Sequence, residues 1–208
     1  MSTMKLALAS LGALAALVAA GCGGAAPKAA PAAPAASPGP AYRGIAVANP
    51  TVAPDFALRD QSGRLVRLSA QRGRYTLVTF LYTHCPDVCP LIAEQLNAAL
   101  RKLGPARRDT SVLAVSVDPK GDTLAAVRRF VAVHRLLPQF RYLRGSAAQL
   151  RPVWAAYHVA ADPEHGTTAI SHTAFVLLVD PQGVERLLYD STVKANEIVH
   201  DIDLLKEK

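Results

Sequence analysis

The chain has 208 residues, of which 50% are hydrophobic and only three are cysteine. A chain of this length holds one domain of ordinary size with additional sequence at an end, and such a domain buries enough core without disulfides or a metal, so we expect the cysteines to serve function. The formal charge of +7 comes from basic residues that are scattered rather than interleaved with aromatic ones, which argues against nucleic-acid binding.

The N-terminus has the pattern of an export signal. Lys5 precedes an uncharged apolar run, residues 6–18, which is too short to span a bilayer but has the length of a signal-peptide core. The run ends in Ala19-Ala20-Gly21-Cys22, which resembles the bacterial lipobox, in which the cysteine is lipidated and becomes the new N-terminus. We expect residues 1–21 to be a lipoprotein signal peptide. A plain secretory signal and an uncleaved anchor are the alternatives, and each of them exports the domain.

The residues after Cys22 form a spacer. Residues 23–41 consist almost entirely of Ala, Pro and Gly, a composition that buries no core and extends the chain. We therefore expect residues 22–41 to tether a folded domain, residues 42–208, to a lipid at Cys22. The predicted location is the bacterial cell membrane, on the side that faces the periplasm or the cell exterior.

The first half of the domain predicts a hairpin, two strands and a helix. Residues 54–58 and 64–68 are short alternating runs on either side of a Ser-Gly turn, which is typical of a hairpin. Residues 75–82 and 111–117 are apolar and rich in β-branched side chains, as buried strands are. Between them, apolar residues recur at helical spacing from Ile92 until the sequence reaches Gly104 and Pro105.

The second half predicts two helices, a pair of strands and a closing helix. Asp122 or Thr123 is the expected cap of one helix and Ser146 of the next, in which Pro152 marks a bend or the start. Two strands follow, joined by a turn, and a helix ends the chain; they are expected at residues 173–179, 185–189 and 198–205. Strands alternating with helices predict an α/β fold, thioredoxin-like, with a central mixed sheet flanked by helices and an N-terminal β-hairpin.

The remaining two cysteines, Cys85 and Cys89, stand where the strand ending at Tyr82 gives way to the helix. Unpaired amides and the positive end of the dipole at a helix start favour thiolates. The spacing places both sulfurs on one side, close enough to share a metal or to form a redox disulfide, Cys85–Cys89. A purely structural disulfide would close too small a loop to add much stability.

A third ligand would distinguish metal binding from electron chemistry. Of the six histidines, His172 immediately precedes the strand at residues 173–179. In thioredoxin-like folds the loop at this position leans over the cysteine pair, so we expect this imidazole to face the sulfurs. His84 adjoins Cys85 but is expected to point the other way, because side chains alternate along a strand.

Several segments together resemble the SCO/SenC family, whose members are thioredoxin-fold proteins that handle copper in cytochrome c oxidase assembly. The resemblance runs from about residue 47 to the C-terminus and depends mainly on the cysteine motif. The matching segments are FLYTHCPDVCP at residues 80–90, SVDP at 116–119, SHT at 171–173 and VDPQG at 179–183.

The resemblance implies a copper site. Cys85, Cys89 and His172 would be the ligands of a copper ion, Cu(I) or Cu(II), and Asp118 would lie next to these ligands rather than on the metal. Ser171 departs from the family pattern, in which an acidic residue often precedes the histidine, and this bears on the orientation of His172.

The same resemblance implies a function and partners. It indicates a monomeric chaperone that delivers copper to the dicopper centre of cytochrome c oxidase subunit II, with another periplasmic copper carrier as donor. The alternatives are a thiol–disulfide oxidoreductase that reduces the cysteines of the target, with Cys85 and Cys89 as its catalytic pair, or a role in redox signalling. Peroxiredoxin chemistry is disfavoured, because Tyr82 stands where a threonine would be needed.

Overall fold

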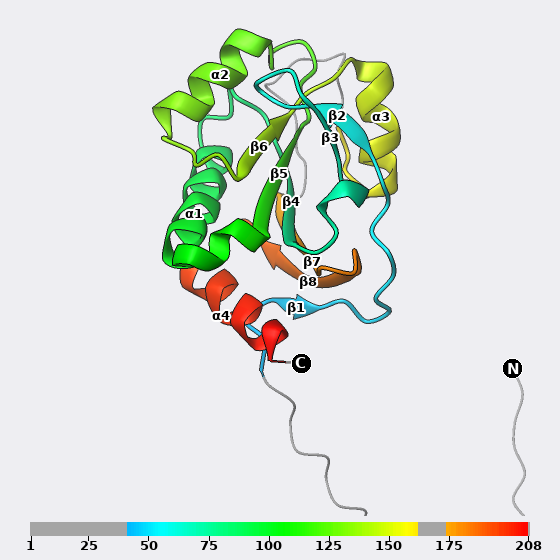
Figure 1. The fold of residues 1–208 in the computed structure, drawn as a ribbon. Coiled ribbons are helices and arrows are strands. Elements are labelled where there is room, and N and C mark those ends of the chain that lie inside the picture. Colours follow the sequence, from blue (N-terminus) through cyan, green and yellow to red (C-terminus); the bar gives the residue numbers. More distant parts are fainter. Residues whose placement is uncertain (1–40, 162–173, 208) are drawn as a thin grey trace, which may run out of the picture. The chain divides into compact units, whose positions relative to one another are not determined.

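A mixed sheet of six strands forms the centre of the structure, a computed structural model that describes residues 41–161 and 174–207 (Figure 1). Three strands run parallel, and the other three continue the sheet in antiparallel fashion. In spatial order the strands are β1 (Ile45–Ala46), β8 (Glu185–Asp190), β7 (Phe175–Val179), β4 (Tyr75–Leu81), β5 (Thr110–Ser116) and β6 (Phe140–Leu143).

The two central strands are the most apolar. Every residue of β4 and β5 is buried, because helices or loops cover both faces of the sheet here. They pair in parallel from Tyr75 with Thr110 to Leu81 with Ser116, so their carboxyl ends lie at the same edge of the sheet. The chain segments that follow these two strands are therefore neighbours, although they are far apart in sequence.

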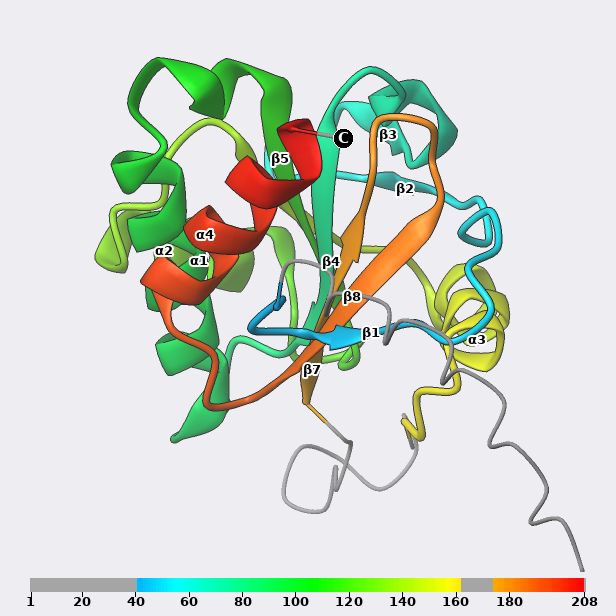
Figure 2. The same ribbon diagram turned by 90° about the horizontal axis from the view of Figure 1, so that it is seen from below.

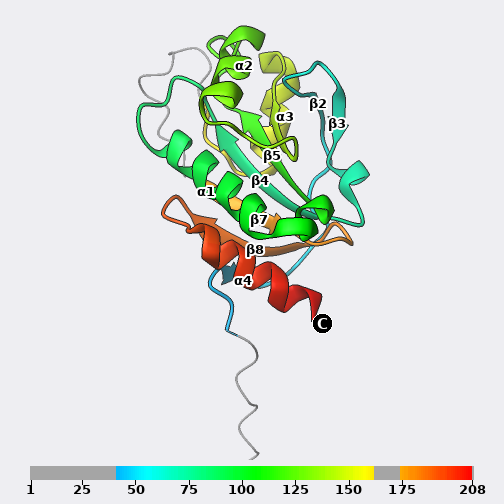
Figure 3. The same ribbon diagram turned by 60° about the vertical axis from the view of Figure 1, so that its left-hand side comes forward.

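Helices cover the sheet unequally. Helices α1, α2 and α4 lie on one face and α3 lies on the other, as Figures 1 and 2 show. Helices α1 and α4 also pack against each other (Figure 3). The helices are α1 (Val88–Lys102), α2 (Leu124–Val133), α3 (Ala147–Ala156) and α4 (Ala195–Lys206).

The predicted caps explain where two of these helices begin. Thr123 precedes α2, and its side chain accepts a hydrogen bond from Ala126 N at 3.2 Å. Ser146 precedes α3 in a capping box with Gln149, so each side chain satisfies a backbone amide of the other residue. Pro152 lies inside α3, and the helix continues past it to Ala156.

The predicted hairpin is present as a separate two-stranded sheet. Strands β2 (Ala57–Arg59) and β3 (Leu65–Arg67) pair antiparallel, as the alternation of residues 54–68 indicated. Gln61, in the turn between them, reaches the outer edge of β6: its Nε2 donates to Phe140 O at 3.2 Å, and its Oε1 accepts from Tyr142 N at 2.9 Å. The hairpin therefore satisfies backbone groups that this edge strand would leave unpaired.

The α/β, thioredoxin-like class predicted from the sequence is confirmed, with two omissions. Strand β6 was not predicted, because it is short and Arg141 interrupts its apolar pattern. Strand β1 has only two residues, both exposed, and it is a strand only through its pairing with β8. Helix α1 begins at Val88 and thus includes Cys89, slightly before its expected start near Pro90.

The chain divides into two units, residues 1–38 and 39–208. The predicted signal peptide (1–21), the lipidation site Cys22 and nearly all of the tether (22–41) lie outside the described residues, so these boundaries stay predictions. No described helix is both long enough and apolar enough to cross a membrane.

Candidate metal centre

The cysteine pair lies at the carboxyl end of β4, in the turn that leads into α1. Cys85 N donates to Tyr82 O at 3.3 Å, which closes the turn. Cys89 is in the first turn of α1, and its backbone N–H donates to the Cys85 sulfur at 3.4 Å. Asp87, the residue that precedes the helix, makes no capping hydrogen bond with its side chain. The Cys85 sulfur therefore does what a capping side chain usually does, and it sits at the positive end of the helix dipole.

The two thiols differ in acidity. Burial by itself would raise the pKa of Cys85, but hydrogen bonds from the Cys89 thiol, from the amides of Asp87 and Cys89 and from the Tyr82 hydroxyl hold it below its usual value. Burial raises the pKa of Cys89, and its hydrogen bond to Cys85 raises it further. Cys85 is partly exposed, whereas Cys89 is fully buried. Cys85 is thus the more acidic thiol of the reduced pair, and it loses its proton before Cys89 does.

Tyr82 contributes to the site directly, which the sequence analysis did not anticipate. Its ring is buried at the end of β4, and its hydroxyl donates to the Cys85 sulfur. Burial, this hydrogen bond and the charge of Cys85 raise the pKa of Tyr82 to about 12. The hydroxyl therefore remains a donor over the whole range in which Cys85 ionises. The sequence signal was the position of the tyrosine, three residues before the first cysteine of the motif.

Two carboxylates that follow β5 lie beside the pair. Asp122 is buried and accepts from Thr83 N and Thr83 Oγ1 at 2.8 and 2.7 Å, and from Ser116 Oγ and Tyr142 OH at 2.6 and 3.1 Å. Burial raises the pKa of Asp122, although these hydrogen bonds oppose the shift. Asp122 thus joins the turn after β4 to the ends of β5 and β6, and its charge adds to the elevation of the Cys89 pKa.

Asp118, predicted to lie beside the metal ligands, is also buried. Its Oδ1 accepts from Gly121 N at 2.8 Å, whereas its Oδ2 has no hydrogen-bond partner. Its charge raises the pKa of Tyr82, which places it within electrostatic reach of the hydroxyl that contacts Cys85. Whether Asp118 influences a metal ion at the sulfurs stays a prediction.

His172 and the residue before it, Ser171, lie outside the described residues, as does His165. The chain is described again from Ala174, just before β7. Val176 of β7 pairs antiparallel with Thr79, and Thr79 Oγ1 donates to Phe175 O at 2.7 Å. The amino end of β7 therefore lies at the same edge of the sheet as the carboxyl end of β4, where the cysteine turn begins.

None of the described histidines other than His84 hydrogen-bonds to Cys85 or Cys89, and two of them contact carboxylates instead. His134 Nδ1 lies 3.1 Å from Glu94 Oε1, and His200 Nδ1 lies 2.9 Å from Asp201 Oδ1. His158 follows the end of α3 in a left-handed backbone conformation. None of these three histidines is a sequence neighbour of Cys85.

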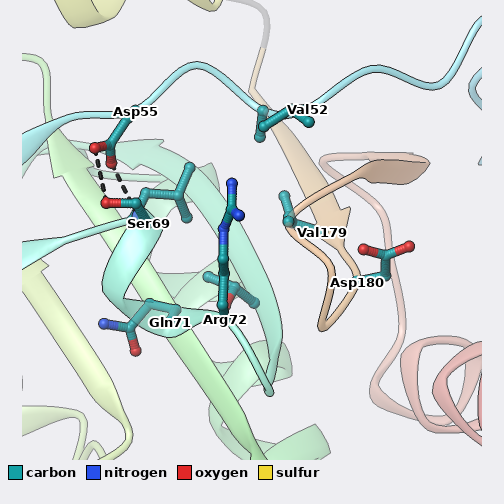
Figure 4. A pocket seen from close by; sticks show the side chains of 11 residues that line it. Val52, Asp55, Ser69, Gln71, Arg72, Val179 and Asp180 are labelled. Carbon is teal, nitrogen blue, oxygen red and sulfur yellow. Dashed lines mark hydrogen bonds between the residues drawn. The ribbon is translucent and has the colours of Figure 1, made fainter.

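Figure 4 shows a cavity at the opposite end of β4, where Ser69 N and Oγ donate to the Asp55 carboxylate at 2.8 Å. Arg72 lines the cavity, and so does Thr76, near the start of the strand. Its volume of about 40 Å³ is too small for a substrate. It plays no part in the cysteine site, which follows the end of the same strand.

The donor set at the cysteines suits a soft metal ion. Both cysteines are free thiols in the structure, and the Cys89 thiol donates a hydrogen bond to the Cys85 sulfur. Thiolate sulfur favours ions such as Cu(I), and a third donor from the start of β7 would complete a three-coordinate site. The same pair, without a metal, has the asymmetry that thiol–disulfide exchange uses, because the pKa of Cys85 is lowered and that of its neighbour Cys89 is raised.

Comparisons with known proteins identify the relatives of this chain. A sequence model of the SCO1/SenC family matches residues 46–207. The mitochondrial SCO2 homolog of Bos taurus is 33% identical over 154 residues, which cover 71% of this chain and 57% of that protein. The SCO2-like protein of Rickettsia conorii is 27% identical over 153 residues, 70% of this chain and 74% of its own length. The chain thus spans less than two thirds of the bovine relative.

Solved structures agree with this match. Bradyrhizobium japonicum ScoI with copper bound is 29% identical, with a TM-score of 0.64, and the alignment covers 75% of this chain and 99% of that one. Apo Sco1 from Thermus thermophilus is 31% identical, with a TM-score of 0.66, over 81% of this chain and 98% of that one. Because the family match covers most of the chain and includes the cysteine turn, the protein belongs to the SCO1/SenC family.

Proposed function

We propose that the protein is a copper metallochaperone that carries one copper ion between the thiolates of Cys85 and Cys89 and the imidazole of His172. Its recipient is the dicopper centre of cytochrome c oxidase subunit II, which it loads during assembly of the oxidase. The observation that carries the proposal is the cysteine pair at the start of α1, where two free thiols share one hydrogen bond.

The chemistry of the pair supports copper as the cargo. The more acidic Cys85 thiol would ionise and bind first, and Cys89 would release its proton when the metal arrives, as thiol ligands do. Two thiolates and an imidazole suit three-coordinate Cu(I), and an added oxygen donor would allow Cu(II). Such a low-coordinate site also leaves room for a ligand of the recipient, so the ion can be exchanged.

The placement of β7 supports His172 as the third ligand. The described chain resumes at Ala174, and β7 begins at the edge of the sheet where the cysteine turn begins, so His172 is two residues in sequence from a position at that edge. Copper is bound in the structure of the similar ScoI from Bradyrhizobium japonicum.

The proposed cellular arrangement follows from the N-terminal sequence. Residues 1–21 would direct export, Cys22 would carry the lipid, and the Pro-rich residues 23–41 would hold the domain away from the bilayer. Mass spectrometry of the mature chain tests this arrangement: a lipid on Cys22 is expected, and an unmodified chain that begins at or near this residue would contradict it.

Copper titration of the reduced full chain tests the ligand set. We expect one equivalent of Cu(I) to bind, His172→Ala to weaken binding by about tenfold or more, and Cys85→Ser to weaken it further, because each variant loses a ligand and Cu(I) prefers the soft thiolate to the imidazole. His134→Ala is the matched control, since that imidazole pairs with Glu94 instead. Equal affinities for the wild-type chain and His172→Ala would remove the metal-carrier proposal.

Copper transfer tests the recipient. The copper-loaded chain is mixed with the metal-free soluble domain of cytochrome c oxidase subunit II, the two proteins are separated, and copper is measured in each. We expect copper in the subunit II fraction, and none there when the cysteines of its dicopper centre are replaced by serine. Copper that stays with the chaperone in both mixtures would refute delivery to this recipient.

A second candidate function is thiol–disulfide reduction of the recipient, favoured by the unequal acidity of the two thiols. The Cys85 thiolate would attack one sulfur of a target disulfide and expel the other as a thiolate. Cys89, after losing its proton, would attack Cys85 and release the second target thiol. Two electrons pass to the target, and the chain is left with a Cys85–Cys89 disulfide.

Trapping of the intermediate tests the second function. In Cys89→Ser the resolving thiol is absent, so a mixed disulfide between Cys85 and oxidised subunit II would accumulate. Cys85→Ser, which lacks the attacking thiol, is the control. If Cys89→Ser yields no mixed disulfide under conditions in which wild-type protein loads copper, reduction of this target is excluded.

A further inference from the structure

A buried carboxylate oxygen next to the cysteine turn has no partner among the described residues. Asp118 is only 5% exposed. Its Oδ1 accepts from Gly121 N at 2.8 Å, but its Oδ2 accepts no hydrogen bond. An ionised oxygen removed from water in this way is costly unless a proton donor or a cation approaches it.

Asp118 Oδ2 meets the ring of His84 above the backbone of Gly121. A methyl group at Gly121 would overlap Asp118 Oδ2 and would lie 3.1 Å from His84 Nδ1. Both atoms therefore border the same point in space, which the missing side chain of Gly121 leaves open. His84 is exposed, so this point is reached from solvent on the imidazole side.

Among the described residues, His84 Nδ1 has one hydrogen-bond partner, Thr83 Oγ1 at 3.3 Å. Because Thr83 Oγ1 already donates to Asp122 Oδ1 at 2.7 Å, it accepts from Nδ1–H, and a metal ion at Nδ1 would replace this one bond and leave the proton on Nε2. Asp122 lies close to both groups: one ligand atom each from His84, Asp118 and Asp122 fall within 4.8 Å of one another. No Lys or Arg of the described chain forms an ion pair with either carboxylate.

We propose that these residues form a second metal site, independent of the cysteines, for a divalent transition-metal cation such as Zn²⁺. His84 Nδ1 and Asp118 Oδ2 would bind the ion directly, and the Asp122 carboxylate would be its third, negatively charged neighbour. Imidazole and carboxylate donors suit borderline divalent ions, whereas Cu(I) prefers sulfur. The dithiol and this site would therefore select different ions, although they lie on consecutive residues, His84 and Cys85.

Asp122 has a supporting role in this site. Its four hydrogen bonds to Thr83, Ser116 and Tyr142 hold the turn after β4 against the loop after β5. The two direct ligands come from these two segments, so their approach depends on the pairing of β4 with β5. Water would complete the coordination of the ion on the exposed side, as in other open sites.

The test uses Zn²⁺ and the full chain in the background Cys85→Ser/Cys89→Ser, which removes the thiols and makes the result independent of the proposed function. Calorimetric titration is expected to show one equivalent of Zn²⁺ bound. His84→Ala and Asp118→Asn should each weaken binding by about tenfold or more. Asp118→Asn is the conservative choice, because its Oδ1 still accepts from Gly121 N.

Two further variants serve as controls. Gly121→Ala should abolish Zn²⁺ binding by filling the space between the ligand atoms, whereas His200→Ala should leave it unchanged, because that imidazole contacts Asp201 in α4. Thermal unfolding is measured with and without Zn²⁺ for each variant, since an ion that binds only the folded state raises the melting temperature. Variants that unfold cooperatively but show no Zn²⁺-induced rise have lost the site rather than the fold.

Three outcomes would overturn the proposal. The first is that the background does not bind Zn²⁺ in the millimolar range, which would mean that Asp118 Oδ2 is simply hydrated. The second is equal affinity in the background and in both ligand variants. The third is that binding is lost on His172→Ala but not on His84→Ala, which would assign the ion to the other histidine.

Discussion

Cys85 and Cys89 occupy one turn of the chain, but their surroundings shift their pKa values in opposite directions. Four donors converge on the Cys85 sulfur, whereas Cys89 is enclosed by apolar side chains and contributes its own proton to its neighbour. The result is a pair in which Cys85 is the more acidic thiol and Cys89 the less acidic one. Either metal capture or attack on a disulfide would begin at Cys85, because this sulfur ionises more readily and is also the more accessible of the two.

Alkylation of the reduced chain should therefore label Cys85 first. Because the pKa of Cys85 lies below its usual value and that of Cys89 lies above it, iodoacetamide should modify Cys85 near neutral pH and spare Cys89 until the chain unfolds. Peptide mapping by mass spectrometry at a series of pH values measures both rates. Cys89 labelled in the folded chain before Cys85 would show that the assignment is reversed.

Tyr82→Phe should make Cys85 less acidic. The variant keeps the buried ring but removes the hydroxyl that donates to the Cys85 sulfur, so the pKa of Cys85 should rise. The ultraviolet absorbance of the thiolate, followed against pH, gives the midpoint. The loss of one hydrogen bond should lower the free energy of unfolding by only about 1 kcal/mol. Tyr157 is also buried, but its hydroxyl donates to Pro54 O. Tyr157→Phe is therefore the control and should leave the midpoint unchanged.

At the level of elements, the N-terminal segment of the domain is held to α4 and β8 by one buried carboxylate. Asp201 in α4 accepts from Arg43 N, from Gly44 N and from Tyr189 OH, at distances from 2.8 to 3.1 Å. Gly44 lies against the Tyr189 ring so closely that a methyl group there would be 2.7 Å from it. This contact attaches the segment just after the predicted tether.

Asp201→Ala should loosen this attachment. Two backbone amides and a buried hydroxyl would lose their acceptor, so the free energy of unfolding should fall by about 3 kcal/mol. Hydrogen exchange should become faster at residues 43–47, which include β1. Asp203→Ala, which removes an exposed partner of Lys206 in the same helix, should cost about 0.5 kcal/mol or less. A similar fall in the free energy of unfolding in both variants would show that Asp201 does not anchor the N-terminal segment.

At the level of the whole molecule, we expect several buried tyrosines to lower the free energy of unfolding at alkaline pH. Burial raises the pKa of each of these tyrosines above its usual value: Tyr82, Tyr142, Tyr157 and Tyr189. In the unfolded chain these groups lose their protons near pH 10, whereas in the folded chain they keep them. The unfolded state then binds fewer protons, so the free energy of unfolding should fall as the pH rises above about 10.

Urea unfolding at about pH 8 and about pH 11 measures this dependence. The midpoint should be lower at the higher pH, and Tyr189→Phe, which removes one of the buried phenols, should reduce the difference between the two. A midpoint that is the same at both pH values would show that the phenols ionise equally in the folded and unfolded chain.

Much of this architecture could be predicted from local patterns. The apolar runs of β4 and β5, the caps at Thr123 and Ser146 and the turn of the β2–β3 hairpin are encoded within a few residues of each element. The two missed strands show the limit of such patterns. Strand β6 depends on β5 and on the Gln61 side chain for its hydrogen bonds, and β1 depends on β8.

The sequence by itself determined the order of the elements other than β1 and β6, the cysteine pair at a strand-to-helix turn and the family, because each is encoded in adjacent residues. Only the tertiary structure decided that Tyr82 donates to Cys85, and that His84 and Asp118 meet above Gly121. The first contact depends on how the turn after Tyr82 closes, with Cys85 N donating to Tyr82 O, and the second on the parallel pairing of β4 and β5, which brings together loops far apart along the chain. Periodicity tells which face a side chain occupies, but not which distant side chain it will meet there.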